Sequence, residues 1–252
     1  SVSSADKAEV AVLATGSVSI ASAAGAGSRG GATDVSSLSG EQTITSALDA
    51  AGDNINIVAD EITIDAPIQS AGAVLAIAPI DLGRVIVLGY DQNQIYDSSP
   101  QYIDPKFSGA LYLTDTSLGN IQDGFQQVVI GSDAGYNIIQ IGNKDTTTES
   151  VTLNNPLVLK TPSLGGGVYI YDNLVLTGTS SLTIHGSGNT THIVNSDVTA
   201  GGNIDYDDSV VIVGDVTITA GTSGSGYIQV GTNSSHSLNG NAADPNDSLI
   251  LN

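Results

Sequence analysis

VTLNNPLVLKTPSLGGGVYIYDNLVLTGTSSLTIHGSGNTTHIVNSDVTAGGNIDYDDSVVIVGDVTITAGTSGSGYIQVG, residues 151–231, repeats one pattern along its whole length. Short runs rich in Val, Ile, Leu and Thr, such as residues 182–184 and 216–219, alternate with breaks of Gly, Ser, Asn and Asp. β-Branched runs of this length between turn residues predict short β-strands. One such turn of chain is too thin to bury a core, whereas stacked turns share one. The stretch therefore predicts a solenoid of stacked β-strands.

The composition suits the narrow interior of such a coil. The 252 residues include 30 Gly, nine Tyr and two Phe, with no Trp and no Met, so Ile, Val, Leu and Ala must fill the core. Gly, together with Ser, Thr, Asn and Asp, supplies the residues that turns require. A chain of this length forms one domain of ordinary size or one solenoid segment.

The charge restricts the partners. Six Lys and Arg stand against 26 Asp and Glu, a formal net charge of −20. So few basic groups argue against binding to nucleic acid or to an anionic membrane. The same charge keeps a β-rich body soluble and makes divalent cations, calcium above all, suitable partners. The chain has no Cys, which excludes disulfides and thiol chemistry, and no apolar run long enough to insert in a membrane.

The chain divides into two parts. Residues 1–40 are the least regular and are expected to form an N-terminal cap or linker, with strands at residues 10–14 and 18–20. Residues 41–252 are expected to form the β-helix. Residues 42–51 are open between a short helix, because Leu48 follows Ile44 by four residues, and a strand, because residues 42–45 alternate. We expect the chain to be a mature product or an excised piece, because it has no leader segment.

An insertion interrupts the coil at about residues 90–108. It contains Tyr90, Tyr96 and Tyr102 among Asp, Gln, Asn and Pro. Polar loops between regular elements often carry recognition residues, so these three Tyr are candidate binding residues. The alternative is a lateral loop that lays its rings on the coil to cover apolar surface.

Two segments of the sequence resemble a known protein family. LYLTDTSLGNIQDGFQQVVIGSDAGYNIIQIG (residues 111–142) and VVIVGDVTITAGTSGSGYIQVG (residues 210–231), with SLNG and SLILN after them, resemble a unit of large bacterial exoproteins of the filamentous-haemagglutinin type. The resemblance implies a right-handed parallel β-helix. It implies a structural stalk or filament-forming segment of a secreted bacterial cell-surface adhesin. Its expected partners are other copies, neighbouring segments of the same exoprotein, or a carbohydrate or cell-surface ligand.

Asp205, Asp207 and Asp208 form the one dense acidic cluster. A solvated turn is one interpretation. A calcium site is the second, because Ca²⁺ takes six to eight oxygen ligands and these carboxylates could supply several. Catalysis is the third.

The same fold class includes enzymes that cleave polysaccharides, by hydrolysis or as lyases. His185-Gly186 lies near the acidic cluster in sequence, but it precedes the Asp pair, whereas in polygalacturonase-like enzymes it follows. No Arg or Lys comes after Lys160, although a uronate lyase needs a cationic group. We therefore expect no enzyme, with a polysaccharide-active enzyme or a carbohydrate-binding module as alternatives. His185, His192 and His236 are expected to be isolated surface residues.

Overall fold

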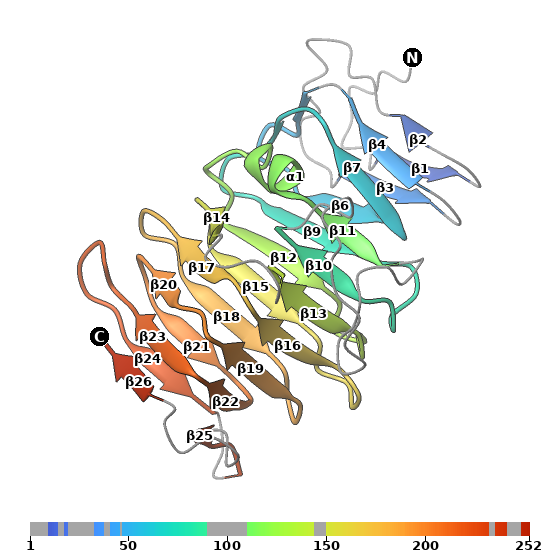
Figure 1. The fold of residues 1–252 in the computed structure, drawn as a ribbon. Helices are drawn as coiled ribbons and strands as arrows, with labels where there is room; N and C mark the ends of the chain where they lie inside the picture. Colours follow the sequence, from blue (N-terminus) through green and yellow to red (C-terminus); the bar gives the residue numbers. More distant parts are fainter. Residues whose placement is uncertain are drawn as a thin grey trace.

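The computed structural model describes residues 10–14, 18–19, 33–37, 41–45, 47–89, 110–143, 150–231, 235–240 and 248–252. These residues form short strands and one five-residue helix. All pairings between the named strands are parallel. Figure 1 shows the strands as successive layers from the N-terminal end to the C-terminal end. The protein is a parallel β-helix.

Sheet 1 runs through the whole stack. Neighbouring strands in it come from successive coils, so the sheet records the coils in chain order. Its strands are β1 (Val10–Ala14), β3 (Thr33–Ser37), β6 (Ile55–Val58), β9 (Val74–Ala78), β12 (Gln127–Gly131), β15 (Leu157–Lys160), β18 (Leu182–His185), β21 (Ile204–Tyr206) and β24 (Ile228–Val230).

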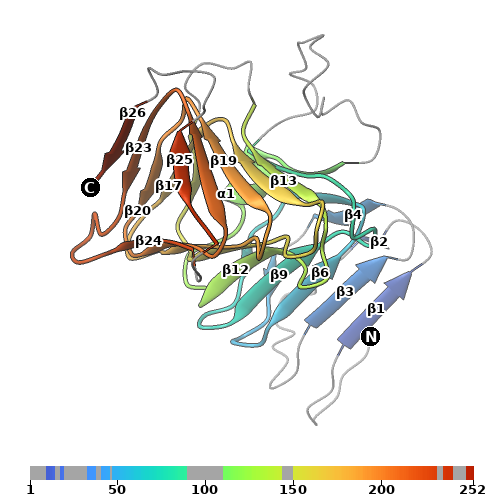
Figure 2. The same cartoon turned by 90° about the horizontal axis from the view of Figure 1, so that it is seen from below.

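Sheets 2 and 3 form the other two sides of the coil, and Figure 2 shows the three sides around a common interior. The strands of sheet 2, in spatial order, are β11 (Leu111–Leu113), β10 (Ile86–Leu88), β13 (Ile138–Ile141), β16 (Gly167–Ile170), β19 (Thr190–Val194), β22 (Ser209–Val213) and β25 (Leu238–Gly240). Those of sheet 3 are β14 (Ser150–Leu153), β17 (Asn173–Leu176), β20 (Val198–Ala200), β23 (Asp215–Thr219) and β26 (Ser248–Leu251).

Two small sheets continue the coil toward the N-terminus. One contains β2 (Val18–Ser19), β4 (Glu41–Ile44) and β7 (Glu61–Ile64), and the other contains β5 (Leu48–Asp49) and β8 (Ile68–Gln69). Strands β1, β2 and β3 therefore lie within residues 1–40 and pair with strands of the coil or of its small sheets. The strands expected at residues 10–14 and 18–20 are confirmed as β1 and, in shorter form, β2.

Aliphatic columns fill the interior. Along sheet 1, paired residues of successive strands point inward and are fully buried, because a period of two sends every second side chain to the same face. Most pairs in these columns are Ile, Leu or Val, which pack at the close spacing of neighbouring strands. The first column runs through Ile55, Leu75, Val128, Leu157, Leu182 and Ile204, and the second through Ile57, Ile77, Ile130, Leu159, Ile184 and Tyr206.

The structure settles the choice left open at residues 42–51. This segment holds β4 and β5, so the helix alternative is wrong and the strand alternative is confirmed. A strand directs every second side chain to the same face, which matches the alternating burial along β7. Strand β4 pairs Ile44 with Ile64 of β7, and both are fully buried.

The only helix among the described residues, α1 (Asp115–Gly119), was not predicted. Its N-cap is Thr114, whose side chain accepts a hydrogen bond from the backbone N–H of Ser117, and Asp115 lies in the first turn. Both are ordinary signals of a helix start. Five residues are too few to be seen by periodicity. This helix is too short to cross a lipid bilayer.

Among the described strands, the direction of stacking reverses near α1. Strand β11 follows β10 in the sequence but lies on the N-terminal side of it, because β10 pairs with β11 on one edge and with β13 on the other. The other side of β11 contacts β7. The expected insertion at residues 90–108 joins β10 to β11. It lies outside the described residues, as do Tyr90, Tyr96 and Tyr102.

We predict that Ile184→Ala lowers the free energy of unfolding by about 2–5 kcal/mol, because it leaves a cavity in a fully buried column. Thr183→Ala is the matched control. Thr183 lies next to Ile184 on β18 but points outward, so its loss is expected to stay within about 0.5 kcal/mol. Urea denaturation followed by circular dichroism measures both. Equal losses in the two variants would contradict the inward register of Ile184.

Candidate functional site

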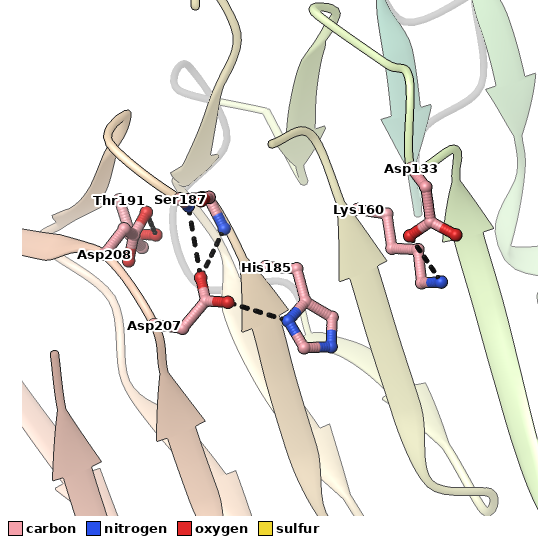
Figure 3. Close-up of polar contacts among 8 residues, drawn as sticks. Asp133, Lys160, His185, Ser187, Thr191, Asp207 and Asp208 are labelled. Carbon is pink, nitrogen blue, oxygen red and sulfur yellow. Dashed lines mark hydrogen bonds and ion pairs between the residues drawn. The ribbon is translucent and has the colours of Figure 1, made fainter. Parts of the chain in front are cut away.

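A row of charged side chains follows the corner between sheets 1 and 2. Lys160 and His185 are paired residues at the ends of β15 and β18. Asp207 directly follows β21, which pairs with β18. Asp133 lies just beyond the end of β12, one coil before Lys160. Figure 3 shows the four side chains along this edge of the coil.

The row forms two separate pairs, an ion pair between Lys160 and Asp133 and a hydrogen bond between His185 and Asp207. The Nζ atom of Lys160 lies 2.7 Å from Oδ1 of Asp133, and Nδ1 of His185 lies 2.8 Å from Oδ2 of Asp207. The side chain of Asp133 is 84 % exposed, so water screens the first pair and it contributes little to stability. The second pair is more sheltered, because only 23 % of the Asp207 side chain is exposed. The expectation that all three His are isolated surface residues is therefore wrong for His185, and the aromatic stack described below makes it wrong for His192 as well.

Asp207 also holds the backbone of the preceding coil. Its Oδ1 accepts hydrogen bonds from the N–H groups of Gly186, at 2.7 Å, and Ser187, at 3.2 Å. Ser187 has a φ of 41°, a left-handed conformation that few non-glycine residues adopt. Bonds from two successive N–H groups help to hold this turn. Both oxygens of Asp207 are thus occupied in joining two coils.

Asp208 points the opposite way, into the coil. It is fully buried, and its Oδ2 accepts a hydrogen bond of 2.9 Å from the hydroxyl of Thr191. Its Oδ1 has no hydrogen-bond partner. Burial raises the pKa of Asp208, the bond from Thr191 lowers it and the charge of Asp207 raises it, and the resulting pKa is about 7.

Tyr206 and Thr191 complete a polar island in the aliphatic interior. Both are fully buried, and the hydroxyl of Tyr206 has no hydrogen-bond partner. Burial, and then the charge of Asp208, raise the pKa of Tyr206. Thr191 occupies an inward position of sheet 2 between Val168 and Val210. Sequence reasoning missed this island, because nothing in the spacing showed that Thr191 would lie beside Asp208.

Gly186 lies directly against the buried carboxyl group. A Cβ atom at this position would overlap both the carboxyl group and Cβ of Asp208. The His185-Gly186 pair therefore has a packing role in this structure: the imidazole bonds to Asp207 outside, and the missing side chain leaves room for Asp208 inside.

Asp205 has a third environment. It lies on β21, and its Oδ2 accepts a hydrogen bond of 3.3 Å from the hydroxyl of Tyr227 on the next coil. The negative charge of Asp205 raises the pKa of Tyr227. The three Asp predicted as calcium ligands are thus divided between Tyr227, the Gly186 turn and the interior. Among the described residues, no three acidic or His side chains are grouped to hold a metal ion. Calcium binding stays a prediction with no described site.

His192 belongs to an aromatic stack on the outer side of sheet 2. Its ring lies 4.7 Å from that of Tyr169, with 3° between the planes, and Tyr169 also stacks with Tyr171 at 6.2 Å. Burial lowers the pKa of His192. The ring faces are turned toward one another along the stack, which favours a structural role for the three side chains.

The positions of the three Asp side chains can be compared with what polysaccharide cleavage requires. Glycoside hydrolysis needs two carboxyl groups on one exposed surface. Asp208 is inside the coil, where a polymer on the outer surface cannot reach it, and Asp207 is bound to three groups of the preceding coil. Of the predicted acidic cluster, Asp205 is the carboxylate held by a single exposed partner.

Comparisons with protein-family models, curated proteins and solved structures gave no match to this chain. The resemblance to exoproteins of the filamentous-haemagglutinin type therefore stays a prediction. The class that the structure defines is that of the parallel β-helix.

We predict that Gly186→Ala destabilises the protein by about 1–3 kcal/mol, because the new methyl group displaces the carboxyl group of Asp208. The control is Gly224→Ala, since a Cβ at Gly224 would meet no atom within 4 Å. Urea titration gives both values. If Gly186→Ala lowers the free energy of unfolding no more than Gly224→Ala does, the space beside Asp208 can hold a methyl group.

Proposed function

We propose that this chain is a structural segment, a stalk or filament-forming unit of a secreted bacterial cell-surface adhesin. The observation that carries the proposal is the continuous stacking of parallel coils, in which sheet 1 joins strands from β1 to β24. Such a stack is rigid along its axis and can be lengthened by adding coils, which is what a stalk requires.

The last described coil supports extension by stacking. Strands β24, β25 and β26 are the final strands of their sheets. Ile228, Leu238 and Leu249 stand in inward positions but are only partly buried. Leu251 pairs with the fully buried Ile218, yet it is 51 % exposed. An open strand edge beside a half-covered core favours pairing with a further β-coil. For the isolated chain, we propose that a second copy supplies it.

The charge supports an uncharged or cationic ligand on the sides of the coil. The two cationic side chains described, Arg84 and Lys160, are each paired with an Asp, at Asp60 and Asp133. The net charge of −20 repels polyanions. A neutral carbohydrate or a cell-surface protein fits this surface better than nucleic acid or an anionic membrane does.

We predict that the purified chain associates as its concentration rises, giving rods in electron micrographs and higher masses in light scattering. Leu251→Lys is expected to weaken association at least about tenfold, because a charge would have to be buried between coils. Leu164→Lys is the matched control, because Leu164 is 85 % exposed on the turn between β15 and β16, away from the end of the stack.

Three results would contradict the proposal. Monomers at every concentration would exclude self-stacking of this chain. Equal weakening by Leu251→Lys and Leu164→Lys would place the contact elsewhere. Release of sugar ends from a panel of polysaccharides, lost in Asp205→Asn, would favour the enzyme instead.

A further inference from the structure

The island of Tyr206, Thr191 and Asp208 lies between two coils near the C-terminal end of the stack. It places a carboxyl group in a fully buried position with one hydrogen bond and one unpartnered oxygen. An ionised carboxylate in such a place costs much more free energy than the protonated form does. The next coil, with β24 and β25, stacks directly on β21 and β22, the strands on either side of Asp208.

We propose that Asp208 makes this corner a proton-sensitive joint, which holds the C-terminal coils more tightly in mildly acidic than in alkaline solution. The positions of Asp207 and Asp208 decide which change of pH weakens the joint. Asp207 bonds to the preceding coil on the outer surface, so Asp208 is the carboxyl group of this turn that is buried inside. Loss of its proton leaves a buried charge against the Gly186 turn, with Thr191 as its hydrogen-bond donor.

Other titratable groups surround the turn. Asp207 adjoins Asp208 in the chain, and His185 lies beyond Asp207 on the preceding coil. Tyr206 lies on the inward face of β21. His192 follows Thr191 on β19 but belongs to the outer stack with Tyr169. Val210 and Leu238 are paired residues of β22 and β25. Asp208 precedes Val210 by two residues and His236 precedes Leu238 by two, so His236 occupies the place on the following coil that corresponds to Asp208.

The sign of the effect follows from linkage. The pKa of Asp208 is about 7 in the folded protein, against 3.8 as its ordinary value. Between these values the folded state keeps a proton that the unfolded state has lost. The free energy of unfolding therefore falls as the pH rises from about 4 to about 7, and the contribution then levels off.

The experiment measures urea unfolding of the whole chain between pH 4.5 and pH 8.5 for the wild type and Asp208→Asn. The difference between the two removes the effect of the other carboxylates. Over this range the unfolding constant of the wild type is expected to rise at least about tenfold more than that of Asp208→Asn. Hydrogen exchange at pH 6 and pH 8 should place the loss of protection in β24 and β25. Parallel pH profiles for the two proteins would overturn the proposal.

Two further variants keep the test decisive if Asp208→Asn does not fold. Thr191→Val removes a hydrogen bond that favours the charged carboxylate, so the loss of stability should extend to higher pH. An unshifted profile in Thr191→Val would count against the joint. His236→Gln is the control for the imidazole at the corresponding place on the following coil. A pH dependence abolished by His236→Gln would assign the effect to that residue and overturn the role of Asp208.

Discussion

Register between parallel strands of neighbouring coils is the constraint on which the structure depends. Each strand pairs with a strand about one coil away, so an inward position in one coil fixes an inward position in the next. A shift by one residue would turn Ile184 outward and Thr183 inward and would break the column on both sides. The two aliphatic columns of sheet 1 are the result of keeping this register from Ile55 to Ile204.

Polar side chains keep the register at the corners, where strands end. On the side of sheet 3, Asn173 accepts a hydrogen bond from the backbone N–H of Asp197, and Asp197 accepts one from that of Thr217. At the corner of sheets 1 and 2, Asp207 does the same for the Gly186 turn. These bonds link side chain to backbone from one coil to the next, in addition to the pairing between strands. The abundance of Asn and Asp in the sequence has a structural purpose at such corners.

The sequence was sufficient for the strands and for the solenoid, because alternation and turn residues act over a few positions. It was insufficient for the partners of each side chain. The step between coils on sheet 3 varies, from 24 residues at Asn173 to 20 at Asp197 and 33 at Asp215. Without a constant step, nothing in the chain shows that His185 meets Asp207 or that Thr191 meets Asp208. The cluster of Asp205, Asp207 and Asp208 misled for a related reason, since a strand followed by a turn sends adjacent carboxylates to different sides.

The reversed order of β11 and β10 has a consequence for the way the chain can fold. A solenoid can grow by adding each new coil to the one before it, in the order in which the chain emerges. Here β10 emerges first, but its place in the stack requires β11 between it and β7. Growth from the N-terminus must therefore pause at β9 until residues 111–113 arrive. Strand β13 pairs with β10, and the buried core is continuous from Ile44 to Ile218, so the later coils stack on this rearranged edge.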